Sequence, residues 1–94
     1  MKTYRIDGSR IRSKADFFTE IGRAVNGDDG YFGSNLDALA DCLRGGFGTP
    51  QEGGFRFVLT GYRPARAALG APVWDTLLRA FTDAQVDLWL ENTG

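Results

Sequence analysis

Apolar and polar positions follow two different periods along the chain, and the change between them predicts the elements. Apolar side chains alternate with polar ones over residues 2–6 and 86–91, which predicts β-strands. Residues 55–60 form an apolar run rich in aromatic and β-branched side chains, which also predicts a strand. Residues 14–25 and 34–44 instead carry apolar side chains three and four positions apart, a spacing typical of amphipathic helices.

Two further helices are expected between the second and third strands. A weak alanine-rich stretch follows Pro64, and a stronger apolar face runs from Val73 to Phe81 and ends near Ala84. The predicted order is therefore β-α-α-β-α-α-β. Because parallel neighbours need long crossover connections, this order predicts an α/β fold with a small three-stranded parallel sheet packed by helices. Ninety-four residues suffice for a single domain, residues 1–94.

Short polar residues predict where the helices begin. Ser13 with Asp16, and Ser34 with Asp37, have the spacing of a capping box. Between the two helices, residues 26–30 are all typical of turns and lead into a loop. The apolar run of the second strand predicts burial on both faces of the sheet.

Composition excludes several classes of function. The sequence has no histidine and one cysteine, Cys42, so histidine-dependent nucleophilic catalysis and a cysteine-based zinc site are not available. A net charge of −1 lacks the basic excess of a nucleic-acid binder. No apolar run approaches the ~20 residues of a membrane span, and we expect a soluble, cytoplasmic protein without cofactor or metal.

One segment is strongly acidic. Residues 27–43 contain four aspartates and neither lysine nor arginine. At 100° per residue, Asp37 and Asp41 share one exposed face of the second helix, opposite its leucines. In one interpretation Asp37 completes the cap and Asp41 is simply solvated. In the other, the two carboxylates present acceptors to a basic partner.

The same segment carries a resemblance to a known family. Residues 31–43, with the sequence YFGSNLDALADCL, resemble the signature of the barstar-type ribonuclease inhibitors. Residues 6–16 and 77–84 also resemble that family, whereas residues 46–72 match it poorly. The resemblance implies a small parallel sheet packed by helices. It also implies a protein that binds a secreted guanyl-specific microbial ribonuclease inside the cell that makes the ribonuclease, without catalysis of its own.

The resemblance further implies which residues bind the ribonuclease. Asp41 corresponds to the carboxylate that takes the place of an RNA phosphate, and Asp37 to its partner one turn earlier. Tyr31 corresponds to the loop aromatic that covers the catalytic cleft. The other positions implied in the contact are Gly33, Asn35, Ala40, Arg44, Gly45, Gly46 and Asp83.

Three of these positions depart from the family pattern. Ala40 and Gly46 stand where the best-known member has tryptophans, which are enriched among residues that dominate binding energy. Arg44 adds a cation at the edge of the acidic face. The departures predict a partner related to, but different from, that member's ribonuclease, or an affinity that depends more on charge.

Two alternatives remain beside the inhibitor. In one, Asp37, Asp41 and Asp83 hold Mg²⁺ or act as acid and base in an enzyme. In the other, the chain is an acidic protein–protein interaction module whose basic partner is not a nuclease. The inhibitor hypothesis predicts a monomer when free and a 1:1 heterodimer when bound.

Overall fold

The chain folds around a three-stranded sheet. The computed structural model describes residues 2–44, 48–49 and 54–92. In chain order, the elements are β1 (Lys2–Asp7), the 3-10 helix η1 (Gly8–Arg10), α1 (Lys14–Asn26), α2 (Leu36–Leu43), β2 (Phe55–Thr60), α3 (Tyr62–Leu69), α4 (Ala71–Asp83) and β3 (Asp87–Glu91). This order confirms the predicted α/β fold, with the short 3-10 helix η1 as an additional element after β1.

All three strands are parallel and stand in the order β1-β2-β3. The register places Tyr4 opposite Phe57 and Phe57 opposite Leu88. One crossover, with α1 and α2, joins β1 to β2, and a second, with α3 and α4, joins β2 to β3. The long connections that parallel neighbours require are therefore both helical, as the sequence predicts.

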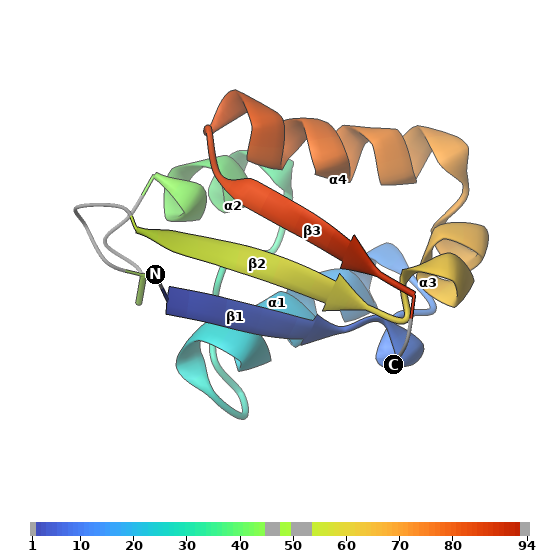
Figure 1. Ribbon diagram of the computed structural model, residues 1–94, viewed down its shortest axis with the longest axis horizontal. Helices are drawn as coiled ribbons and strands as arrows, with labels where there is room; N and C mark the ends of the chain where they lie inside the picture. The colour runs from blue at the N-terminus through green and yellow to red at the C-terminus, as the bar shows by residue number, and fades with distance from the viewer. Residues whose placement is uncertain (1, 45–47, 50–53, 93–94) are drawn as a thin grey trace.

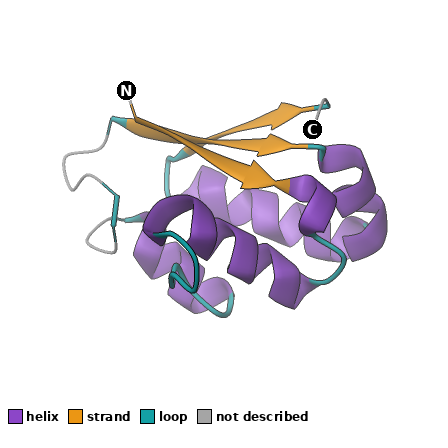
Figure 2. Cartoon of the chain, turned by 90° about the horizontal axis from the view of Figure 1, so that it is seen from below, coloured by secondary structure: helices purple, strands orange, loops and turns teal. Residues whose placement is uncertain are grey.

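The helices cover only one face of the sheet. Figure 1 shows the strands in front of the helices, and Figure 2 shows the same sheet edge-on with the helices on one side. The covered face carries Tyr4, Ile6, Phe57 and Leu59, which are buried against the helices in one apolar cluster. The fold thus has two layers, and its core lies between them.

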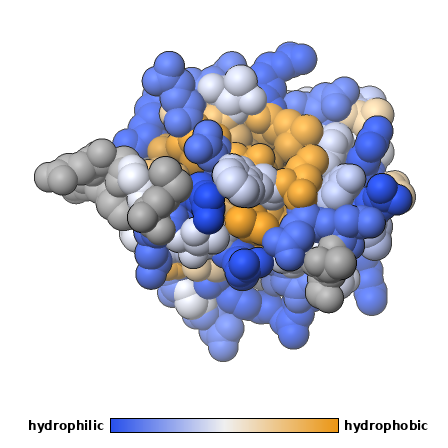
Figure 3. All heavy atoms as spheres, viewed as in Figure 1, coloured by the Kyte–Doolittle hydropathy of each residue, from blue (hydrophilic) through white to orange (hydrophobic). Residues whose placement is uncertain are grey.

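The expectation that β2 is buried on both faces is confirmed at the centre of the strand, although helices cover only one of the two faces. Arg56, Val58 and Thr60 point to the face without helices, where Figure 3 shows apolar side chains in the middle and polar ones around them. Val58 is only 5% exposed, and its register partners on the neighbouring strands are Arg5 and Trp89. The Arg56 guanidinium lies 4.4 Å from the centre of the exposed Trp89 ring. Long side chains replace the second helical layer here.

Two helix boundaries differ from the expectation. Helix α3 begins at Tyr62, two residues before Pro64, and α4 begins at Ala71, with Pro72 in its first turn. Proline is tolerated there because the first N–H groups of a helix have no partner within it. Each proline therefore lies just inside a helix rather than before it. At α1 the predicted cap is confirmed, since the Ser13 hydroxyl accepts from the Asp16 N–H.

Candidate functional site

The N-cap of helix α2 lies one residue later than predicted. This cap is Asn35, whose Oδ1 accepts a hydrogen bond of 2.8 Å from the Ala38 N–H, and Ser34 lies outside the helix. Asparagine caps as well as serine, so the sequence alone does not separate the two positions. The predicted range 34–44 becomes Leu36–Leu43, and Asp37 remains in the first turn. Asn35 therefore has a structural role that fixes where the acidic helix starts.

The two faces of α2 are as predicted. Leu39, Cys42 and Leu43 are buried in the core, and Asp37 and Asp41 are exposed on the opposite face. Burial raises the pKa of the Cys42 thiol, and the nearby Asp41 charge acts in the same direction. A thiol held in its neutral form is a poor nucleophile. Cys42 is consequently a core residue beneath the acidic face.

Arg44 changes the charge of this face. Its Nη1 lies 3.4 Å from Asp41 Oδ1, and both side chains are largely exposed. An ion pair in water contributes about 0–1 kcal/mol, so a cation from a partner can displace it. Asp37 forms no ion pair within the described part of the chain. The acidic face therefore has one free and one weakly paired carboxylate.

The loop before α2 holds one aromatic side chain inside and its neighbour outside. Phe32 is 0% exposed and packs against Phe57 in the core, whereas Tyr31 is 53% exposed. The Asn26 side-chain amide donates a 2.7 Å hydrogen bond to the Tyr31 carbonyl oxygen. The loop backbone is thus fixed from α1 and from the core, and Tyr31 is presented on a supported backbone.

Two glycines allow this loop to pack closely. Gly33 has φ of +96°, and a Cβ there would lie 2.9 Å from the Leu39 amide nitrogen. A side chain at Gly22, on α1, would collide with the Gly30 carbonyl oxygen. Both positions require glycine because of close backbone approach. Gly33 therefore shapes the loop, whether or not it also contacts a partner.

Helix α4 brings Asp83 beside α2. A hollow of about 240 Å³ between the two helices is lined on the α2 side by Leu36, Ala40 and Arg44. On the α4 side the lining residues are Thr76, Arg79, Ala80, Asp83 and Ala84. Three predicted site residues, Ala40, Arg44 and Asp83, thus share one hollow. Gly45 and Gly46 lie outside the described residues.

A comparison with models of protein families shows which family the chain belongs to. The sequence model of the family described as Barstar (barnase inhibitor) matches residues 1–94, the whole chain. The chain belongs to the barstar family. No curated protein matches the sequence. The barstar match includes residues 46–72, which by themselves resemble the family only poorly. The family relationship therefore extends beyond the acidic segment. The family description also gives a class of function, inhibition of a ribonuclease.

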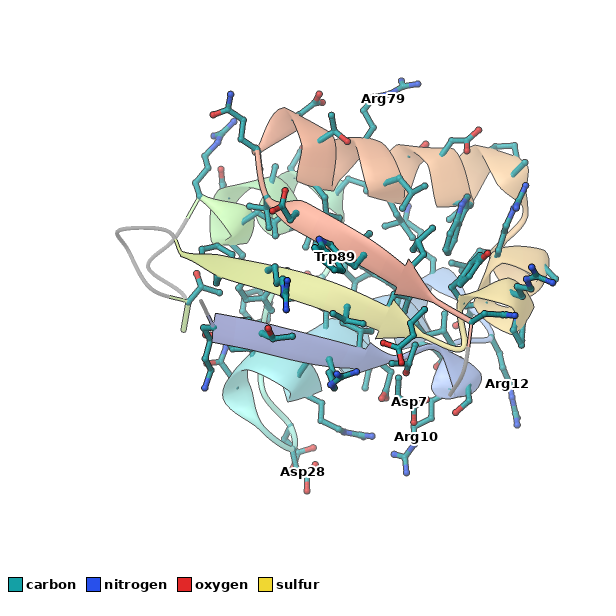
Figure 4. The ribbon with its side chains drawn as sticks, viewed as in Figure 1. Asp7, Arg10, Arg12, Asp28, Arg79 and Trp89 are labelled. Carbon is teal, nitrogen blue, oxygen red and sulfur yellow. The ribbon has the colours of Figure 1, made fainter. Side chains whose placement is uncertain are left out.

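Arg79 was not among the predicted site residues. This residue extends into solvent from α4 (Figure 4) and lines the same hollow as Arg44. The signal was present in the spacing, because Thr76, Arg79, Ala80 and Asp83 recur at helical intervals along one side of α4. It was not used because nothing in the sequence shows that this side faces α2.

The four aspartates of the acidic segment do not form one surface. Asp28 and Asp29 line a second hollow, of about 680 Å³, together with Arg5, Arg10 and Arg23. The Arg23 Nε lies 3.4 Å from Asp28 Oδ1. Figure 4 shows Asp28 and Arg10 at one edge of the molecule and Arg79 at the opposite edge. Only Asp37 and Asp41 belong to the face that the barstar signature marks.

Other kinds of site receive no support from the described residues. Among residues 2–44, 48–49 and 54–92, no three histidine, cysteine, aspartate or glutamate side chains are grouped so that they could hold a metal ion. In the same part of the chain, no helix is both long and apolar enough to cross a membrane.

Proposed function

We propose that this chain inhibits a secreted, guanyl-specific microbial ribonuclease by binding one-to-one across its active site. One observation carries the proposal: in a member of the barstar family, Asp37 and Asp83 are exposed without an ion pair to any described residue, and Asp41 has only the exposed Arg44. Isolated carboxylates that remain unpaired on two neighbouring helices are available to a partner.

The chemistry of the partner follows from the carboxylates. An enzyme that cleaves RNA holds a phosphate with lysine and arginine side chains, and a carboxylate offers those side chains similar acceptor oxygens. Asp41 and Asp37, one turn apart on α2, take the place of phosphates in this proposal. Asp83 reaches the rim of the same cleft from α4. The summed field of the three carboxylates increases the rate of encounter with a basic cleft.

Tyr31 supplies contact area in the proposed complex. Tyrosine buries a large surface with little loss of side-chain entropy and is frequent among residues that dominate binding. The Tyr31 backbone is already fixed by Asn26, and its neighbour Phe32 is anchored in the core. A surface ordered before binding loses less entropy when the complex forms. Rigid support of the loop therefore favours tight inhibition.

Inhibition itself requires no catalysis by this chain. A ribonuclease whose phosphate-binding site is filled by α2 cannot bind RNA, so the complex is inactive for as long as it persists. The chain is expected to be a monomer when free and half of a 1:1 heterodimer when bound, acting in the cytoplasm of the cell that secretes the enzyme.

The test is a titration into a panel of small secreted guanyl-specific ribonucleases, with RNA cleavage followed at low and high salt. Sharp 1:1 inhibition that forms more slowly in high salt supports electrostatic steering. Asp41→Ala is expected to weaken inhibition, whereas the matched Asp28→Ala, also exposed but on the other hollow, is not. Equal potency of Asp41→Ala and the unaltered chain would contradict the assignment of Asp41.

A folded protein that inhibits no member of the panel would contradict the proposal as a whole. The acidic interaction module with a partner that is not a nuclease would then be the better explanation of the exposed carboxylates.

A further inference from the structure

The hollow between α2 and α4 differs in character from the acidic face beside it. Its half-buried residues, Leu36, Ala40 and Ala80, are apolar, and its exposed rim carries Arg44, Arg79 and Asp83. A face that only imitates RNA phosphates has no use for two arginines, because they repel the basic cleft that the carboxylates attract. The two arginines at the rim therefore need an explanation other than imitation of RNA phosphates.

We propose that this hollow is a specificity pocket, which takes an apolar side chain of the ribonuclease and a neighbouring carboxylate that pairs with Arg79 and Arg44. The proposal rests on the proposed function and names a further requirement for the partner. Besides its basic cleft, the ribonuclease must carry an acidic group and an apolar side chain at the rim.

The size of the hollow suits one side chain. An apolar cavity of about 150 Å³ can hold a benzene molecule. The space between α2 and α4 is about 240 Å³, and alanine on both helices leaves it open. An aliphatic or aromatic side chain of the partner would fill it and exclude water, as the central residues of interfaces do.

The charges at the rim suit a carboxylate. Arg79 forms no ion pair with any residue that the structure describes, and the ion pair of Arg44 is exposed and readily exchanged. A carboxylate between two guanidinium groups accepts charge-assisted hydrogen bonds. Asp83, at the end of the same hollow, opposes this anion and so favours a partner whose cation lies beside its carboxylate.

The arginines then discriminate between ribonucleases. A ribonuclease with the acidic group gains an ion pair at the rim. One that has only basic residues there leaves Arg79 facing like charge, which weakens binding. Specificity thus arises from a repulsive as well as an attractive contact.

The decisive variant is Arg79→Glu, measured against the ribonuclease that the chain inhibits most strongly in the panel. The proposal predicts weakening of about tenfold or more. A rim that meets only basic residues predicts the opposite sign, because the variant adds a carboxylate to the acidic face. Arg63→Glu, with the same charge change at an exposed position of α3, is the control and should stay within about threefold, because distant surface charges are screened.

A second pair of variants tests the apolar part of the pocket. Ala40→Leu places a side chain in the hollow and should weaken inhibition by about tenfold or more. Ala68→Leu makes the same change on exposed α3 and should have no effect. Leucine favours helix as alanine does, so both variants are expected to fold, which circular dichroism and urea unfolding check.

The outcomes separate this proposal from the proposed function. If Arg79→Glu inhibits as well as or better than the unaltered chain while Asp41→Ala is weakened, the pocket is wrong and the inhibitor stands. If no ribonuclease is inhibited, the proposed function fails and the pocket fails with it. If Arg79→Glu is weakened, changing the rim carboxylates of the ribonuclease to lysine one at a time should restore binding in one case, and restoration by none would also overturn the pocket.

Discussion

Two acidic regions of this molecule use their carboxylates in opposite ways. Around the hollow between β1 and α1, Asp7 lies 3.6 Å from Arg10, and both Glu20 and Asp28 lie within 3.4 Å of Arg23. On the face formed by α2 and α4, Asp37 and Asp83 have no such partner in the described part of the chain. The hollow of the first region is lined by four carboxylates and three arginines. What distinguishes the two regions is that three carboxylates of the first region form ion pairs, whereas on the second face Asp41 alone does so among the described residues.

The comparison indicates that the positions of the arginines separate two kinds of carboxylate, those paired within the fold and those available to a partner. A carboxylate already paired within the fold adds little to the attraction of a partner. A carboxylate without an internal partner contributes to the field that a basic protein meets. We therefore expect substitutions in the first region to change stability and substitutions in the second to change binding.

The largest effect is expected from removing both charges on α2. Asp37→Asn with Asp41→Asn should weaken ribonuclease binding by on the order of a thousandfold, because each hydrogen bond to a charged group contributes about 1.5–3 kcal/mol. Asp28→Asn with Asp29→Asn removes the same charge from the other region and should leave affinity nearly unchanged. Calorimetric titration of both double variants measures the contrast, and equal losses would remove the distinction between the regions.

The next prediction concerns stability, for which substitutions in the first region are expected to have the larger effect. Glu20 is 6% exposed, and its carboxylate is 3.3 Å from the half-buried Arg23 guanidinium. Glu20→Ala leaves that guanidinium with fewer partners and should lower the free energy of unfolding by about 1–3 kcal/mol. Asp41→Ala should change it by less than about 0.5 kcal/mol, as is usual for exposed positions. Urea unfolding measures both, and a larger loss from Asp41→Ala would contradict the assignment.

A third substitution acts on the loop that joins the two regions. Gly22→Ala brings a methyl group against the Gly30 carbonyl oxygen, so the loop must move. We expect about 1–3 kcal/mol lower stability, as for overpacked sites, together with weaker ribonuclease binding because Tyr31 shifts with the loop. At Gly27, with φ of +81°, an added Cβ meets no atom within 4 Å. Gly27→Ala should therefore lower stability through backbone strain while affinity per folded molecule stays the same.

The smallest effect depends on pH. The Ser9 hydroxyl donates a 2.6 Å hydrogen bond to Asp7 and is the main reason that the pKa of this carboxyl lies below its usual range. A lowered folded-state pKa stabilises the fold above the unfolded pKa, and this contribution is lost as pH falls through the folded pKa. Ser9→Ala should therefore lower stability slightly at neutral pH, and the difference should shrink in acid. Unfolding curves from pH 7 to pH 2, with NMR titration of Asp7, measure it; a difference that grows in acid would contradict this account.

The sequence predicted the sheet well because turn residues bound its strands. Each strand also has either alternating apolar residues or an apolar run. Residues 55–60 form β2 without any shift. Burial at the centre of that strand was also predicted, but the sequence did not show what covers each face, since a run of apolar residues looks the same whether helices or long side chains cover it. The neighbours of Val58 in the sheet are Arg5 and Trp89, and only the register shows this.

The site was predictable where it is local in sequence. The spacing within α2 placed Asp37 and Asp41 on one exposed face, and the structure has them there. Asp83 beside Arg44, and Arg79 beside both, depend on how α4 packs against α2, about forty residues later in the chain. Serine and asparagine are about equally good N-caps. The sequence could therefore not show that the cap of α2 is Asn35 rather than Ser34.

The parallel registers also determine when the binding surface can exist. Lys2 pairs with Phe55, so β1 and β2 meet only after a long loop closes, and Arg56 pairs with Asp87 after a second one. Such distant pairings form slowly because chain entropy is lost before contacts compensate for it. Helix α2 lies in the first crossover and α4 in the second. A nascent chain therefore carries its aspartates early, but it has the joint surface of α2 and α4 only once synthesis has passed β3 and both closures are complete.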